Sequence, residues 1–367
     1  MTTLKEVYAV FKKYLHIPDT RIIDLLLAVA LTVKIKGTKI WVIIVGPSGD
    51  TKTALVSPLE GLDGVLVTIK LDQLTRNTLA SGMQDKRGRP VKDLGGKING
   101  KDVLFIIPDL ASLISKRCDE KNEIWGQLRN LYDGFISKDT GSGVTRKYNN
   151  CNVTLIGCAT EKIRGETLIH NQLGTRELLY NTDSEFGKKK ILKAWDNEKV
   201  ESDMKRELKD VVRSFVLLHK YLDIDDKDID DDMKNYILES AERLSVLRAT
   251  GEFDRNMELV SHVSKETPTR ATKQLKRLYK ALKSLDPDYP DKRAKEIICR
   301  LVNSSGDAIM QEVMNFLKTH RSPHYIQEIC DAIKLDRRGV KPRLDMLWNM
   351  GYVIRERDGK YLKYCWI

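Results

Sequence analysis

A short apolar run followed by a glycine-rich loop constrains the fold of this chain more than any other feature. Residues 41–55 read WVIIVGPSGDTKTAL, in which five apolar residues precede two glycines and then Lys52 and Thr53. Phosphate-binding loops follow the pattern G-x-x-x-x-G-K-[ST] between a strand and a helix. Only Thr51 departs from that pattern, and it keeps the N–H group that a bound anion needs. The residues predict a buried strand, a phosphate-binding loop and a helix, in that order.

The loop supplies the groups that bind a nucleoside triphosphate. Gly46 and Gly49 leave the backbone N–H groups unhindered. Lys52 suits the β- and γ-phosphates, and Thr53 offers a hydroxyl to Mg²⁺. We predict that ATP contacts the whole loop, which comprises Gly46, Pro47, Ser48, Gly49, Asp50, Thr51, Lys52 and Thr53. The alternative is a strand-to-helix turn that carries Lys52-Thr53 by chance, and Pro58 shortens the helix that follows.

Three more apolar runs predict further buried strands, at residues 64–71, 102–109 and 152–160. Residues 4–35 carry apolar positions at helical spacing and predict one or two helices. Buried strands that alternate with helices are typical of an α/β core with a parallel sheet.

The third apolar run ends in a single acid. Residues 103–107 are followed by Pro108 and Asp109, where nucleotide-hydrolysing sites commonly place an Asp-Glu pair. We predict that Asp109 holds Mg²⁺ or positions the attacking water. The alternative is that Asp109 caps the helix that follows the strand.

The second half of the chain is charged and helical, and it ends in a distinct small unit. After LDPDYPD at 285–291 come three amphipathic helical segments and a hairpin with Asp358-Gly359 at its turn. This order is the outline of a winged helix. We predict four domains: N-terminal helices packed on the core at 1–36, an α/β core at 37–190, a helical lid or linker at 191–290, and a winged helix at 291–367.

Basic residues cluster where a winged helix contacts DNA. The third helix of such a unit enters the major groove, and the wing touches the backbone. The predicted contacts are Arg337, Arg338, Lys341 and Arg343 at the start of that helix, and Arg357 and Lys360 in the hairpin. The alternative is a winged helix that packs against another protein.

The charge and the cysteines indicate a DNA-binding protein of the cytoplasm. The formal net charge is +11 with a pI near 9.2, which favours polyanions as partners. The six cysteines are scattered without a C-x-x-C pair, as in reduced cytosolic proteins. The longest apolar run, at 22–33, is too short to cross a bilayer, and we expect no membrane association.

The order of local strings resembles AAA+ ATPases of the minichromosome-maintenance (MCM) helicase type. It is most similar to the compact MCM-like replication ATPases of phages, plasmids and integrated elements. The similar strings are WVIIVGPSGDTKT, LDQLTRNTLASG, NEIWGQLRNLYDGFISK, NQLGTRELLY, LSVLRAT and ETPTRATKQL, in the family's order. The resemblance implies an AAA+ fold with a P-loop core and a helical lid, ATP and Mg²⁺ as cofactors, and a homo-oligomeric ring, expected to be a hexamer, on DNA.

The resemblance also implies roles for individual residues. Thr160 matches sensor 1, where asparagine is usual, and Arg270 matches the sensor 2 arginine. Arg176 matches the arginine finger, which reaches the γ-phosphate bound by a neighbouring subunit. Residues 134–150 fall where the family carries a hairpin in the central channel. The DNA contacts implied there are Lys138, Arg146 and Lys147.

Three functions are consistent with these residues. The first is an ATP-hydrolysing DNA helicase or translocase of the MCM type, acting in replication of a mobile genetic element. The second is an ATP-binding initiator or regulator with weak or absent hydrolysis, which the missing second acid and Thr51 favour. The third is an AAA+ protein that remodels a protein partner.

Overall fold

The computed structural model describes residues 2–35, 37–49, 51–62, 64–83, 85–87, 91, 93–139, 145–166, 175–182, 188–219 and 226–367. The chain forms two compact units, and each is assembled from several segments. The first unit takes residues 1–163, 176–234 and 273–298, and the second takes residues 164–175, 235–272 and 299–367. The four continuous domains expected from the sequence stay a prediction.

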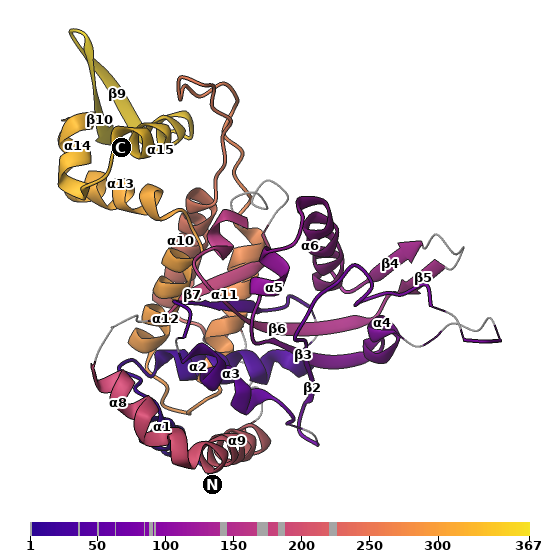
Figure 1. Ribbon diagram of the computed structural model, residues 1–367. Helices are drawn as coiled ribbons and strands as arrows, with labels where there is room; N and C mark the ends of the chain where they lie inside the picture. The colour runs from indigo at the N-terminus through magenta and orange to yellow at the C-terminus, as the bar shows by residue number, and fades with distance from the viewer. Residues whose placement is uncertain are drawn as a thin grey trace. The chain divides into compact units, whose positions relative to one another are not determined.

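A five-stranded parallel sheet forms the centre of the first unit (Figure 1). Its strands, in spatial order, are β2 (Val67–Lys70), β3 (Lys101–Ile107), β6 (Cys151–Ala159), β1 (Trp41–Val45) and β7 (Glu177–Asn181). Every neighbouring pair is parallel. The prediction of an α/β core with a parallel sheet is therefore confirmed, and β1, β3 and β6 are buried as expected. The edge strand β2 is partly exposed, so its predicted burial is wrong.

The sequence predicts four of these strands and misses β7. The strand reads ELLYN, and its first residue, Glu177, is a carboxylate that lies buried in the fold. A run of five residues with a charge at one end does not stand out as a buried strand. Its pairing with β1 sets Trp41 opposite Glu177 and Val45 opposite Asn181.

Helices of the first unit vary from single turns to long amphipathic segments. They are α1 (Leu4–Tyr14), α2 (Arg21–Leu31), α3 (Lys52–Val56), α4 (Leu94–Ile98), α5 (Ala111–Ile114), α6 (Cys118–Tyr132), α8 (Lys188–Asn197) and α9 (Glu201–Leu218). The helices α10 (Asp231–Leu247), α11 (Thr269–Lys283) and α12 (Asp291–Ser304) belong partly to each unit. No helix in the described part of the chain is long and apolar enough to cross a membrane.

The helices predicted at 4–35 are confirmed as α1 and α2. Thr3 starts α1 with a capping box, since its hydroxyl accepts from the N–H of Glu6 while the Glu6 carboxylate accepts from the N–H of Thr3. Helix α2 is buried along its whole length except for Arg21.

One buried carboxylate joins α2 to a segment near the end of the first unit. Asp24 is fully buried and accepts hydrogen bonds from the hydroxyls of Tyr8 and Tyr289. The guanidinium of Arg293 on α12 pairs with it at 2.5 Å. A buried charge is tolerated when it is paired and fully hydrogen-bonded, and this cluster meets both conditions.

Two further strands form an antiparallel hairpin at the place where the resemblance implies one. Strands β4 (Ile136–Asp139) and β5 (Thr145–Tyr148) pair with Lys138 opposite Arg146. Residues 140–144 lie outside the described residues.

The C-terminal part of the second unit has the predicted order of three helices and a hairpin. It contains α13 (Ala308–Thr319), β8 (His324–Tyr325), α14 (Ile326–Ile333), α15 (Arg337–Asn349), β9 (Val353–Asp358) and β10 (Tyr361–Trp366). The strands form a sheet in the order β8-β10-β9. Gly359 adopts a positive φ of 59° at the hairpin turn, which explains the glycine there. A second hairpin-like segment at 250–264 is closed by the bridges Thr250–Ser264 and Phe253–Leu259.

Candidate nucleotide site and nucleic-acid interface

The carboxyl ends of three neighbouring strands bring the predicted nucleotide residues to one edge of the sheet. Val45 of β1 lies opposite Ala159 of β6, and the N–H of Gly46 donates to the Ala159 carbonyl at 3.2 Å. On the other side of β6, the N–H of Leu110 donates to the Cys158 carbonyl at 2.9 Å. The loop after β1, the turn after β3 and Thr160 after β6 therefore leave the sheet together. Ligands of open parallel sheets bind at this edge.

The loop after β1 is built around the ammonium group of Lys52. The side chain is only 8% exposed, and its Nζ donates to the carbonyls of Gly46, at 2.9 Å, and Pro47. Gly49 has a φ of +74°, and nothing lies within 4 Å of where its Cβ would be. A left-handed glycine and an inward-facing lysine are features that a phosphate-binding loop requires, so these residues fit a triphosphate. Asp50 lies outside the described residues.

The helix behind the loop is short, as Pro58 predicts. Helix α3 has five residues and passes into the single 3₁₀ turn Ser57–Leu59, which contains Pro58. Thr51 occupies the N-cap position of α3, with φ −67°. Because a helix of five residues has a small dipole, the backbone N–H groups and Lys52 must supply most of the attraction for an anion here.

Two oxygen-bearing side chains at this edge suit a magnesium ion. Thr53 on α3 and Asp109 after β3 are both exposed. Oδ1 of Asp109 accepts from the N–H of Ala111 at 2.8 Å, so the aspartate also caps the turn that begins α5. Hydroxyl and carboxylate oxygens are the ligands that Mg²⁺ prefers, and this pair fits the ion that accompanies ATP.

Arg176 lies at the opposite edge of the sheet. It directly precedes β7, whose first residue, Glu177, is level with the first residue of β1. The five residues of β1 separate this level from the loop at Gly46, a span of about 16 Å. That span is longer than an arginine side chain, so Arg176 does not reach the loop of its own chain.

The surroundings of Arg176 hold a second guanidinium, that of Arg129, and two carboxylates, those of Asp133 and Glu177. Arg176 pairs with Asp133 at 3.0 Å and is 13% exposed. Burial, together with the positive charge of Arg176, lowers the pKa of Arg129, which shows that the two cations are close. Gln274, almost fully buried, donates to the Arg176 carbonyl at 2.7 Å and to the Tyr132 hydroxyl at 3.0 Å. The two guanidinium groups are thus balanced by the carboxylates of Asp133 and Glu177.

Arg270 also lies beside this segment. Its guanidinium donates to the carbonyl of Thr175, the residue before Arg176, at 3.2 Å, and to Glu266 at 3.3 Å. Thr160, in contrast, follows β6 at the edge of the Lys52 loop and is half-buried.

The basic residues of the β4–β5 hairpin differ in how accessible they are. Arg146 is 8% exposed, and its guanidinium donates to the carbonyls of Ser81, Met83 and Val91. Lys138 donates to the carbonyl of Arg76 and to the side chain of Asn77. These contacts hold separate segments of the chain together. Among the basic residues described on the hairpin, Lys147 alone is exposed. For Arg146 this corrects the expectation of a DNA contact, because a guanidinium bound to three carbonyls is not available to a phosphate.

The six basic residues predicted in the C-terminal subdomain also fall into two groups. Lys341 pairs with Glu258 at 2.9 Å and Asp345 at 3.0 Å, and Arg343 pairs with Asp307 at 2.6 Å. Burial lowers the pKa of Lys341, but its bonds to the two carboxylates outweigh burial and raise it. The other four are exposed and have no side-chain partner in the described part of the chain: Arg337, Arg338, Arg357 and Lys360.

The sequence does not point to three of the residues that shape these sites. Asp133 pairs with the guanidinium of Arg176, and Gln274 donates to the Arg176 carbonyl. Glu258 pairs with Lys341. The partners are 43, 98 and 83 positions away, as follows from their residue numbers. No local pattern marks a side chain whose role depends on a contact of that range.

Comparisons with known proteins match solved structures but no family. No protein-family model and no curated protein matches the chain. A solved structure described as "SCCmec type IV Cch - active helicase" superposes with a TM-score of 0.44 and 12% sequence identity, over 99% of this chain and 69% of that chain. A superposition this loose carries no argument about function, which must come from the residues of this chain.

Proposed function

We propose that this chain is an ATP-hydrolysing, ring-forming AAA+ ATPase of the MCM type that moves on DNA. The observation that carries the proposal is the separation of the Lys52 loop from Arg176 across the sheet. A catalytic site that needs both must combine the loop of one subunit with the arginine of the next. Contacts between different faces of successive subunits close into rings. The resemblance of the sequence to replication ATPases adds the replication of a mobile genetic element as the setting.

The residues of the loop bind and orient the substrate in this proposal. Backbone N–H groups of the loop beyond Pro47 and the ammonium of Lys52 hold the phosphates. Thr53 and Asp109 hold the Mg²⁺ ion, and Asp109 or Thr160 orients the attacking water. Bound Mg²⁺ neutralises charge that develops on the phosphates.

Arg176 of the neighbouring subunit completes the site. Its guanidinium would place positive charge beside the γ-phosphate as the bond to the leaving group breaks. Arg129 adds a second guanidinium near Arg176, and the carboxylates of Asp133 and Glu177 balance the two charges. Arg270 remains the sensor 2 arginine that the resemblance implies, and its guanidinium donates to the carbonyl of Thr175.

The C-terminal subdomain would act as a winged helix on DNA. Its order of helices and its sheet fit that fold, and Arg337 and Arg338 lie exposed at the start of the third helix. Arg357 and Lys360 extend the same charge onto the hairpin. Contacts of this kind bind phosphates without selecting a sequence.

The test measures ATP turnover, with and without DNA, for the wild type and three variants. Lys52→Ala should abolish turnover, and Arg176→Ala should lower it about a thousandfold or more. Asp133→Asn removes the partner of Arg176 but keeps the arginine, so it should retain turnover. If Arg176 only stabilised the fold, Asp133→Asn would imitate Arg176→Ala, and the proposal would be wrong.

Mixing the two inactive variants tests whether the site is shared. An interface is complete only where the Arg176→Ala chain gives the loop and the Lys52→Ala chain gives the arginine. In a random equimolar mixture this combination restores about a quarter of wild-type turnover. Arg206→Ala changes an exposed arginine on α9 and serves as the control, with no expected loss. Failure of the mixture to regain any activity would contradict a shared site.

One observation favours the alternative of an ATP-binding switch with weak hydrolysis. Asp109 is the single acid after β3, and one of its oxygens is used to cap α5. Nucleotide binding that depends on Lys52, with no turnover above the Lys52→Ala background, would support that function instead. DNA binding by the C-terminal subdomain would then persist without hydrolysis.

A further inference from the structure

The C-terminal subdomain contains a pocket of about 650 Å³ between α14, the start of α15 and the β9–β10 hairpin. Its size is in the range of pockets that bind small organic ligands. Its lining combines aromatic rings with charges of both signs, and the exposed part is mainly apolar. Rings and charges of the lining are contributed by Tyr325, Glu328, Asp331, Arg337, Lys360 and Tyr361.

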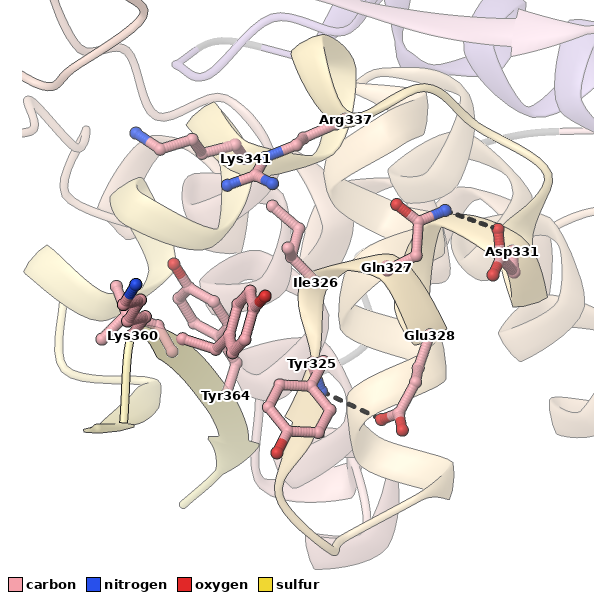
Figure 2. A pocket seen from close by; sticks show the side chains of 11 residues that line it. Tyr325, Ile326, Gln327, Glu328, Asp331, Arg337, Lys341, Lys360 and Tyr364 are labelled. Atoms are coloured by element: carbon pink, nitrogen blue, oxygen red, sulfur yellow. Dashed lines mark hydrogen bonds between the residues drawn. The ribbon is translucent and has the colours of Figure 1, made fainter. Parts of the chain in front are cut away.

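The charges of the pocket are segregated. Figure 2 shows Arg337, Lys341 and Lys360 toward one side, and Glu328 and Asp331 toward the other. Lys341 is neutralised by Glu258 and Asp345. Arg337 and Lys360 have no side-chain partner among the described residues, so the cationic side is able to attract an anion.

The lining of the pocket also offers a flat, exposed ring. Tyr361 is 69% exposed at the mouth of the pocket, whereas Tyr364 is buried and forms part of the wall. The rings of Tyr325 and Tyr361 form a T-shaped pair with centroids 6.2 Å apart. The Lys363 ammonium lies over the Tyr325 ring, 4.6 Å from the centroid of that ring. Tyr361 is therefore the ring whose surface remains open for stacking.

We infer that this pocket binds an unstacked nucleotide of single-stranded DNA. The base stacks on Tyr361, the adjoining phosphate lies against Arg337 and Lys360, and the edge of the base faces Glu328 and Asp331. Aromatic rings beside cations bind single strands because each base offers a flat face and each nucleotide a charge. A base inside a duplex is stacked and paired, so it does not enter a pocket of this size without being extruded.

The carboxylates give the pocket a preference among bases. Carboxylate oxygens accept hydrogen bonds from the exocyclic amino group of cytosine. Thymine has no such group and presents a carbonyl oxygen, which a carboxylate repels. The geometry points to cytosine over thymine in this position.

This inference deepens the proposed DNA contact of the C-terminal subdomain and rests on it, but it needs no ATP turnover. The experiment measures binding of the full chain, without nucleotide, to a labelled oligo(dC) strand, an oligo(dT) strand and a duplex. Tyr361→Ala should weaken binding to oligo(dC) by about tenfold and leave duplex binding within about twofold. Tyr361→Phe keeps the ring and should bind as the wild type does.

Matched variants separate stacking from charge. Arg357→Ala removes an exposed hairpin cation that does not line the pocket, and it should weaken single-strand and duplex binding equally. Asp331→Ala should remove the preference for oligo(dC) over oligo(dT). Loss of duplex and single-strand binding together in Tyr361→Ala, or no loss in either, would overturn the inference while leaving the ATPase proposal intact. Binding that depends on Tyr361 in a chain without ATPase activity would support the pocket and reject the ATPase.

Discussion

The β4–β5 hairpin and the β9–β10 hairpin are both short antiparallel pairs that carry several lysine and arginine residues. In the first, Arg146 and Lys138 are bound to backbone carbonyls of the segment around residues 76–91. In the second, Arg357 and Lys360 are exposed and have no side-chain partner in the described part of the chain. Each hairpin nevertheless contains both kinds of cation. Lys147 is exposed on the first, and Arg355 and Lys363 of the second are paired with carboxylates. The number of cations in a segment does not predict which of these roles they have.

The largest difference between buried and exposed cations is expected in the free energy of unfolding. Arg146→Ala should lower the free energy of unfolding by about 2–4 kcal/mol, because it removes a largely buried guanidinium that binds three backbone carbonyls and lies 3.7 Å from Asp93. Lys147→Ala, on the same strand and exposed, should cost less than about 0.5 kcal/mol. Urea unfolding measures both. A pair of variants with equal stability would show that Arg146 does not hold this region together.

A smaller effect concerns DNA affinity in the C-terminal subdomain. Arg338→Ala should weaken duplex binding and lower the slope of log K against log salt by about one, since one phosphate contact is lost. Arg343→Ala removes a cation already paired with Asp307, and should leave that slope unchanged. It should instead cost about 1 kcal/mol of stability. Salt titrations of the two variants compare them directly, and an equal change in slope would break the distinction between paired and available cations.

The smallest effect is expected where a paired cation is released. Glu258→Ala removes one of the two carboxylates that bind Lys341. The lysine then has more freedom to reach a phosphate, and duplex affinity should rise by no more than a few fold. The same binding assay detects this rise, for which Glu252→Ala in the same segment is the control. A loss of affinity would mean that the 250–264 segment supports DNA binding through its own contacts.

The sequence predicts the framework of this molecule better than it predicts the roles of single side chains. Apolar runs give four of the five strands, because burial on both faces of a parallel sheet demands them. Gly49 and Lys52 have the left-handed and inward-facing arrangement that such a loop requires, and their contact with ATP stays a prediction. Arg146 was expected to contact DNA, and no local pattern indicates its three carbonyl partners. The placement of Arg176 depends on the pairing of β7 with β1, a strand that the sequence did not predict.

The cluster around Asp24 has a consequence for how the chain is made. The partner of this carboxylate, Arg293, is synthesised 269 residues later. At typical rates of translation, α2 must wait roughly 15–50 seconds before its charge can be neutralised. During that interval burial of α2 would leave a carboxylate unpaired, so its final docking is deferred until α12 has left the ribosome. An apolar helix that must wait so long is a natural substrate for chaperones, and a nascent chain arrested before Arg293 should remain bound to them.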